Sequence, residues 1–274
     1  MGHVGNSAAA FVLQRLGHEV WPIATIVLAH HPGHGPAPGR TATPGEIAAL
    51  LDGLAARGAF ARCDAVLSGY LGGPALGPVV LDAVARVRAA NQRAIYCCCP
   101  VMGERAKGFY VRAGIPEFFR DQAVPHADLV ILNPFELAFL AGHPVDDANA
   151  ALAAARALLA RGPRSVVATG LARAEGGKSW IGALLAEAAG PAWLAEAPMV
   201  EAPASGAGDL FAALFLGHLL RGGGPVRALE RAVAATHAVM IATAASGAAD
   251  LALIPTQAAL AGGRKLLFKA RRIG

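Results

Sequence analysis

Short apolar segments alternate with helical patterns along most of this chain, and that alternation restricts the fold more than any other feature. Apolar residues at helical spacing predict helices between runs that have the length of buried strands. The expected strands are 20–28, 65–68, 94–99, 129–132, 165–168, 180–185 and 193–197, the last two as an antiparallel pair; the expected helices are 7–16, 44–57, 78–90, 147–161, 210–219 and 226–245. Because strand–helix–strand units place strands in parallel, the sequence predicts an α/β fold with a doubly wound, mostly parallel sheet flanked by helices.

Composition limits the number of domains and the class of partner. Neither an internal repeat nor a linker divides the 274 residues, so we expect a single α/β domain over residues 1–274. The formal net charge is +5, but lysine and arginine are dispersed except at 264–272, a segment expected to be a solvated end. No aromatic residues interleave with that segment, so no nucleic-acid partner is expected. No apolar run of about 18 residues lacks glycine, proline or charge, so no membrane span is expected either.

The four cysteines do not form a recognisable metal or disulfide pattern. Cys63 stands alone, and Cys97, Cys98 and Cys99 are consecutive, without CxxC spacing. Adjacent residues of a strand point to opposite faces, so three in a row make a poor single metal site. We expect reduced thiols and a cytoplasmic protein.

A small-residue turn leads directly into an apolar helix at 204–215. Gly206, Ala207 and Gly208 precede Asp209, and the helical pattern starts at once. A turn of this kind aims several unpaired N–H groups at one point, where the helix dipole favours an anion. An acid beside a bound phosphate can accept a proton from an attacking hydroxyl. The alternative is an ordinary N-capping Asp209 after a flexible turn.

Polar residues follow most of the expected strands. They are His30 and His31, Ser68 to Tyr70, Cys99 and Pro100, Asn133, and Thr169. Ligands of doubly wound sheets bind beyond the carboxyl ends of the strands, so these residues mark a candidate site. His30, His31 and His34 also invite a metal hypothesis, but no acid or thiol lies near them in sequence, which favours a loop that faces the substrate.

Several segments together resemble the pyridoxal kinase family of the ribokinase superfamily. The segments are Gly206-Ala207-Gly208-Asp209, Gly2-His3-Val4-Gly5-Asn6-Ser7-Ala8-Ala9, Asp64-Ala65-Val66-Leu67-Ser68-Gly69-Tyr70-Leu71-Gly72 and Pro100-Val101-Met102-Gly103. The resemblance implies a ribokinase-like fold and transfer of the γ-phosphate of ATP to the 5′-hydroxyl of pyridoxal. It also implies Mg²⁺ as cofactor and a homodimer.

The resemblance assigns roles to individual residues. Asp209 would be the catalytic base and would contact the substrate, and the amides of Gly206, Ala207 and Gly208 would hold the transferring phosphate. Asn133 and Glu136 would organise magnesium, although an acid at a helix start is also favoured by the helix dipole alone. The other residues with an implied ATP contact are Ile131, Glu136, Thr169, Cys99, Ala197, Pro198, Met199 and Val200. The other residues with an implied substrate contact are His31, Pro32, Gly33 and Tyr70.

The sequence departs from the family pattern at two important places. The family's first strand is absent, so we expect unpaired backbone groups in the sheet, and either a start codon placed too late or an unstable product. Cys99 stands where the family has an acid, which predicts weak magnesium dependence and higher activity in Cys99→Asp, unless Cys99 is a packed core thiol. Two hypotheses therefore stand: an active pyridoxal-type kinase, or a catalytically weak homologue that binds nucleotide or vitamin.

Overall fold

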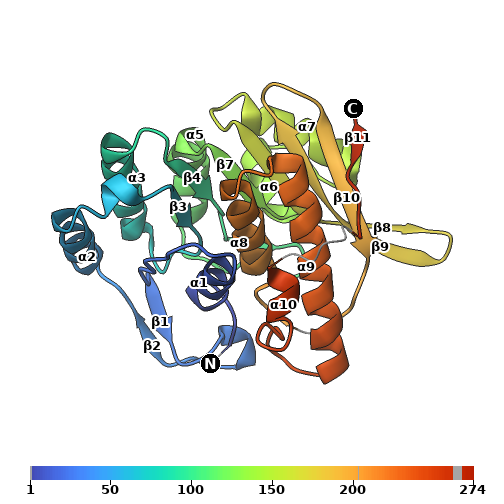
Figure 1. Ribbon diagram of the computed structural model, residues 1–274, viewed down its shortest axis with the longest axis horizontal. Coiled ribbons are helices and arrows are strands. Elements are labelled where there is room, and N and C mark those ends of the chain that lie inside the picture. The colour runs from blue at the N-terminus through green and yellow to red at the C-terminus, as the bar shows by residue number, and fades with distance from the viewer. Residues whose placement is uncertain (1, 203, 262–266) are drawn as a thin grey trace.

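A seven-stranded sheet forms the centre of the protein in a computed structural model that describes residues 2–202, 204–261 and 267–274 (Figure 1). Its strand order is β11-β10-β9-β8-β7-β4-β3. The strands are β3 (Ala65–Ser68), β4 (Ile95–Cys98), β7 (Leu129–Leu132), β8 (Ser165–Glu175), β9 (Lys178–Glu187), β10 (Ala192–Pro198) and β11 (Arg271–Ile273). From β3 to β8 all neighbours are parallel, and β9, β10 and β11 add antiparallel strands. The predicted parallel sheet and its antiparallel pair are both confirmed.

Helices cover both faces of this sheet (Figure 1). One face carries α1 (Asn6–Arg15), α8 (Ala207–Leu220), α9 (Pro225–Ser246) and α10 (Gln257–Leu260). The other face carries α2 (Pro44–Ala56), α3 (Gly77–Ala90), α4 (Ile115–Phe118), α5 (Val124–His126), α6 (Pro134–Ala141) and α7 (Ala148–Leu159), with a π-turn over Phe119–Ala123 and 3₁₀ turns at Pro32–His34, Phe60–Arg62 and Pro74–Leu76. The predicted helices are present, and Thr43 forms a capping box with Glu46 at the start of α2.

The consecutive cysteines show how strand alternation separates the two cores. Cys98 packs in the core under α3 and α6, whereas Cys97 and Cys99 pack in the core under α1 and α8. All four cysteines are free thiols. The three consecutive thiols thus point into two separate cores, which is the arrangement expected of adjacent residues on a strand.

The prediction of a strand over residues 20–28 is largely wrong. Only Ile26–Leu28 is a strand (β1), and it pairs with β2 (Gly39–Thr41) in a separate antiparallel hairpin rather than in the main sheet. Pro22 lacks the N–H that a sheet strand donates, which fits the irregular backbone before β1. The glycine- and proline-rich loop before β2 also contains regular structure, the 3₁₀ turn Pro32–His34.

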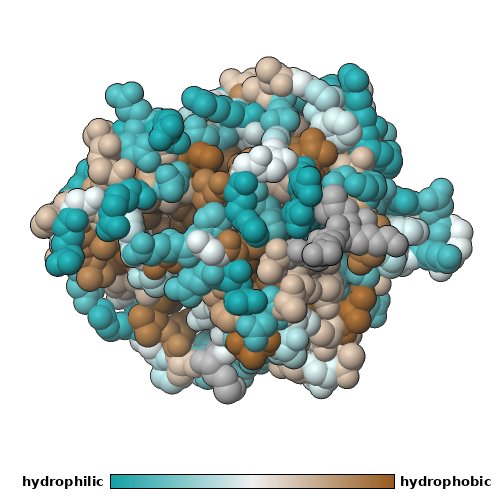
Figure 2. Space-filling view, in the orientation of Figure 1, coloured by the Kyte–Doolittle hydropathy of each residue, from teal (hydrophilic) through white to brown (hydrophobic). Residues whose placement is uncertain are grey.

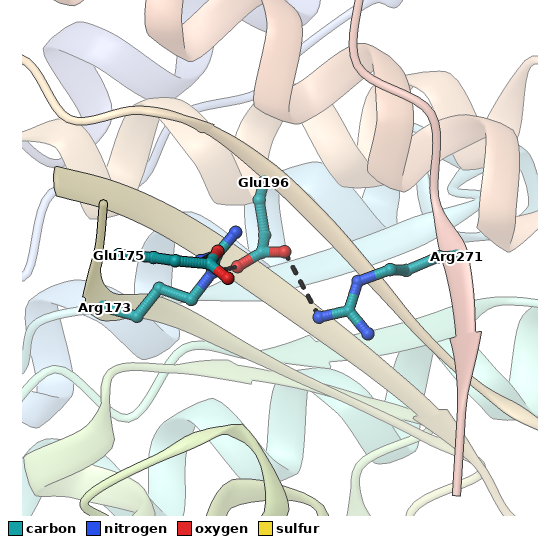
Figure 3. Close-up of polar contacts among 4 residues, drawn as sticks. All are labelled: Arg173, Glu175, Glu196 and Arg271. Atoms are coloured by element: carbon teal, nitrogen blue, oxygen red, sulfur yellow. Dashed lines mark hydrogen bonds and ion pairs between the residues drawn. The ribbon is translucent and has the colours of Figure 1, made fainter. Parts of the chain in front are cut away.

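The carboxyl-terminal segment also differs from the prediction of a solvated end. Residues 271–273 form β11, which pairs with β10, while Arg264 of the predicted basic segment lies outside the described residues. Glu196 of β10 holds β11 through Arg271 and the β8–β9 hairpin through Arg173, which also contacts Glu175 (Figure 3). The Arg271 Nη2 to Glu196 Oε2 distance is 3.3 Å.

β3 is the edge of the sheet on the side of α2 and α3. Among the described residues it has a strand partner only in β4. The unpaired backbone groups expected from the absence of the family's first strand are therefore at this edge and not inside the sheet. Ala65, Val66 and Leu67 remain half-buried, whereas β7 is buried throughout. In the space-filling view the surface is hollowed on this side, with apolar side chains in the hollow (Figure 2). In the described part of the chain, no helix is both long and apolar enough to cross a bilayer.

Candidate active site

A cavity of about 2060 Å³ lies at the carboxyl ends of the parallel strands and extends along β3. This is larger than the roughly 300–1,000 Å³ of typical ligand pockets, so it has room for more than one ligand. The predicted site residues that line it are His31, Pro32, Gly33, Tyr70, Cys99, Ile131, Asn133, Glu136, Thr169, Ala197, Pro198, Val200, Gly206, Ala207, Gly208 and Asp209. Met199 does not line it; this side chain is exposed on the surface.

The start of α8 forms the predicted phosphate seat. Gly206 has φ 99°, and a Cβ there would lie 2.3 Å from the carbonyl oxygen of His3, so only glycine fits. A Cβ on Gly208 would meet nothing within 4 Å, which leaves open space above the helix end. In the described residues, no hydrogen-bond acceptor takes the N–H of Ala207 or Gly208. These donors are therefore free to bind an anion.

Asp209 lies beside this seat, in the first turn of α8. Its Oδ2 accepts a hydrogen bond of 2.7 Å from the backbone N–H of Gly5, which ties the amino-terminal loop to the site. Burial raises the pKa of the Asp209 carboxyl, and the Gly5 bond and His31 act in the opposite direction. A carboxylate with a raised pKa in a cavity is a stronger base, as a general base requires.

Asn133 and Glu136 form a capping box at the start of α6. Asn133 Oδ1 accepts from Glu136 N at 3.0 Å, and Glu136 Oε2 accepts from Asn133 N at 3.0 Å. Glu136 Oε1 also accepts from Met102 N at 3.0 Å, and the side chain is 4% exposed. Burial raises the pKa of Glu136 to about 7. The alternative of a helix-start acid is thus realised in the structure. The carboxylate still borders the cavity, and among the described residues no cationic side chain is bonded to it.

Cys99 borders the same cavity from the end of β4 but is packed in the core, with 7% of its surface exposed. Its interaction with Cys97, followed by burial, raises the pKa of the thiol well above its ordinary value. Asp209 and Glu136 act in the same direction. A raised pKa favours the neutral thiol, and the packing supports the alternative of a core thiol.

The part of the cavity predicted to receive the substrate is lined by the loop before β2 and the residues after β3. His34 Nε2 lies 3.4 Å from Asp250 Oδ1, so the loop contacts a segment adjacent to the phosphate seat. Thr25 Oγ1 donates to the carbonyl oxygen of Tyr70 at 2.9 Å and joins the loop strand to the end of β3. His30, His31 and His34 belong to no metal-binding group of three or more ligands in the part of the chain that the structure describes.

The wall predicted to receive the nucleotide is formed by residues of β7, β8 and β10. Thr169 follows the regular part of β8 at a break in the register with β9, and its Oγ1 donates to the carbonyl oxygen of Leu132 at 3.3 Å. Ile131, Ala197, Pro198 and Val200 complete this wall. The wall is apolar and lies next to the phosphate seat, as the face that receives a base and ribose would be.

Comparison with known proteins agrees with this geometry. Residues 61–252 match the profile of the phosphomethylpyrimidine kinase family. The pyridoxal kinase PdxY of Rubrobacter xylanophilus is 45% identical over 99% of this chain and 93% of its own length. The pyridoxal kinase PdxY of Granulibacter bethesdensis is 44% identical over 91% of this chain and 88% of its own length. The chain belongs to the pyridoxal kinase family.

A solved structure of a pyridoxal kinase has the same fold. The enzyme of Leishmania donovani, in complex with ADP and pyridoxamine, superposes with a TM-score of 0.90 at 25% identity, over 100% of this chain and 96% of that one. The ribokinase-like architecture predicted for the chain is therefore confirmed.

One wall of this pyridoxal kinase site was not found from the sequence. The short hairpin of β5 (Gly103–Glu104) and β6 (Gly108–Phe109) places Glu104, Lys107 and Tyr110 on the cavity. Burial raises the pKa of Tyr110 well above its ordinary value, with Glu136, Glu104 and Asp209 acting in the same direction. Two-residue strands carry no periodicity, and the only signal was the glycine pair that bounds the hairpin.

Proposed function

We propose that this protein transfers the γ-phosphate of ATP to the 5′-hydroxyl of pyridoxal. The observation that carries the proposal is the open seat at the start of α8, with unpaired N–H groups beside a carboxylate of raised pKa. The relatives named pyridoxal kinase support the substrate, and the ADP complex of the Leishmania enzyme supports the nucleotide.

The chemistry follows from the positions of Asp209 and the α8 amides. Asp209 takes the proton of the 5′-hydroxyl as its oxygen bonds to the γ-phosphorus, and the bond from that phosphorus to the β–γ bridging oxygen breaks. The products are pyridoxal 5′-phosphate and ADP. The N–H groups of Ala207 and Gly208 stabilise the negative charge on the transferring phosphate, because the seat is preorganised before the reaction.

Magnesium fits this site as a cofactor held largely by phosphates. Glu136 is a buried carboxylate of raised pKa that borders the cavity, and Asn133 adds an amide oxygen beside it. No group of three or more metal-ligating side chains occurs among the described residues, which agrees with the preference of Mg²⁺ for one or two carboxylates plus phosphates and water. We propose that Asn133 and Glu136 hold the ion, which when bound neutralises charge on the phosphates.

The remaining proposals concern the whole molecule. One sheet with a core on each face supports a single kinase domain over residues 1–274. The free thiols support a reducing, cytoplasmic compartment. The homodimer rests on the family resemblance, and sedimentation velocity tests it.

The deciding experiment is a steady-state assay with ATP, Mg²⁺ and pyridoxal, in which pyridoxal 5′-phosphate and ADP are both quantified. Asp209→Asn keeps the size of the side chain but removes the base, so we expect turnover to fall at least about a hundredfold while ATP binding persists. Nucleotide binding without product from the unmodified protein would instead support the weak homologue. Near-normal turnover in Asp209→Asn would contradict the role of the carboxylate as base.

A further inference from the structure

The β5–β6 hairpin is fixed to the side of the phosphate site by its base. Asn133 Nδ2 donates to the carbonyl oxygen of Gly103 at 2.8 Å, and Tyr110 N donates to that of Met102 at 3.1 Å. Phe109 stacks edge-on against Phe135 and Phe139 of α6, with ring centroids 5.0 and 5.1 Å away. The turn of this hairpin, which carries Lys107, is therefore held at a defined place relative to Glu136.

Lys107 is the one strongly basic side chain at this end of the cavity. In the part of the chain that the structure describes, the cavity is lined by two residues of the lysine and arginine type, Lys107 and Arg62. Arg62 precedes β3 and so lies at the amino-terminal end of that strand, away from the carboxyl ends that carry the site; its guanidinium lies 5.7 Å from the ring centroid of Trp21. The carboxylates Glu104, Glu136 and Asp209 line the cavity on the side of the phosphate seat, so this end is acidic apart from Lys107 and the loop histidines.

Lys107 and Asp209 line the same cavity as His31 and both act on its ring. Burial and His34 lower the pKa of His31, Lys107 lowers it further, and Asp209 raises it. Lys107 and Asp209 therefore share with His31 the part of the cavity beside the loop before β2. A phosphoryl group moving from ATP to a hydroxyl beside Asp209 would pass through this space.

Lys107 is free to move to such a group. Its Nζ lies 2.6 Å from Glu104 Oε1, but the two side chains are 62% and 42% exposed. An ion pair this exposed is weak, so exchange of Glu104 for a multiply charged phosphate is favourable.

We infer that Lys107 is a catalytic residue that binds the β- and γ-phosphates of the nucleotide, with Glu104 holding it in place while the site is empty. The ammonium stabilises charge on the transferring phosphate together with the α8 amides, which line the same cavity. Lys107 forms and breaks no covalent bond. This inference rests on the proposed kinase activity.

The test compares Lys107→Met with Lys107→Arg and with Lys178→Met, which removes an exposed lysine outside the cavity. We expect Lys107→Met to lower kcat/KM for ATP by roughly ten- to a hundredfold. Lys107→Arg restores most of the loss, because the charge returns, and Lys178→Met stays at the unmodified value. Unchanged kcat/KM in Lys107→Met, with an active unmodified protein, overturns the inference but leaves the kinase proposal standing.

Two further measurements separate phosphate contact from a structural role. Propylammonium is expected to raise the turnover of Lys107→Ala in a saturable manner, and Lys107→Met is expected to lose more affinity for ATP than for AMP. Equal losses for the two nucleotides, with no rescue by the amine, would show that Lys107 only shapes the hairpin. An unmodified protein without kinase activity would instead refute the proposed function on which the inference depends.

Discussion

Replacement of the two glycines at the start of α8 separates the stability of the phosphate seat from its chemistry. In Gly206→Ala the new Cβ would lie 2.3 Å from the carbonyl oxygen of His3, at a φ of 99°. The left-handed backbone costs about 1–2 kcal/mol for alanine, and the clash with backbone adds about 1–3 kcal/mol. We therefore expect a loss of about 2–5 kcal/mol in the free energy of unfolding, since the two contributions act at one site.

The loss should be visible as a lower melting temperature. A change of 1 kcal/mol shifts Tm by about 2–4 °C in a domain of this size, which gives a fall of roughly 4–20 °C by differential scanning fluorimetry. Turnover should fall as well, because displacement of His3 moves Gly5, whose N–H bonds Asp209 at 2.7 Å.

Gly208→Ala is the matched control. Its Cβ would meet nothing within 4 Å, so Tm should stay constant or rise slightly as alanine replaces glycine in a helix. The methyl group would project into the seat, however, so we expect KM for ATP to rise roughly tenfold or more. An unchanged Tm in Gly206→Ala, or an unchanged KM for ATP in Gly208→Ala, would refute the geometry assigned to the seat.

The remaining predictions concern the acids and the thiol. Glu136 has a folded-state pKa of about 7, above its ordinary value, so the native state binds more protons than the unfolded state; the free energy of unfolding should therefore fall by about 3 kcal/mol as pH rises from about 4.5 to 7. Glu136→Gln should flatten this pH dependence in urea titrations at several pH values, and a dependence that persists in the variant would assign it to other groups. Cys99→Asp adds a third carboxylate near Asp209 and Glu136, so Tm should fall without metal and recover with Mg²⁺. Activity and magnesium affinity should rise, and no change in activity or in magnesium affinity would leave Cys99 as a core thiol only. Glu196→Gln weakens the contacts with Arg173 and Arg271, so amide hydrogen exchange in β11 should accelerate while turnover stays unchanged. Equal protection from exchange in the variant and the unmodified protein would show that strand pairing alone holds β11.

The sequence predicted those elements whose pattern is local. The boundaries of β3 and β7 match the prediction residue for residue, because each is a continuous apolar run bounded by polar residues or glycine. β8 continues to Glu175, past the predicted end at Ala168, because a glycine and a register break interrupt the pattern without ending the strand. The segment 20–28 was assigned from apolar content, although strand formation there depends on pairing with β2.

In the candidate site, too, some residues could be placed from the sequence and others could not. Residues at strand ends and at the start of α8 could be placed because parallel strands bring their carboxyl ends to one edge. Lys107 and Tyr110 could not be placed, since they reach the cavity only when the β5–β6 hairpin, with a three-residue turn, folds against α6. Met199 was assigned from the family resemblance together with its neighbours; Pro198 and Val200 line the cavity, whereas the side chain of Met199 is exposed on the surface.

The edge position of β3 has a mechanical consequence for the two halves of the site. Tyr70 and the substrate loop are joined to a strand that is paired on one side and half-buried, whereas Ile131 and Thr169 stand on strands paired on both sides in the middle of the sheet. Local opening is easiest where few backbone bonds and contacts must be broken. The vitamin side of the cavity should therefore open and close as a separate, softer unit, while the nucleotide side stays rigid and sets the position of the phosphate.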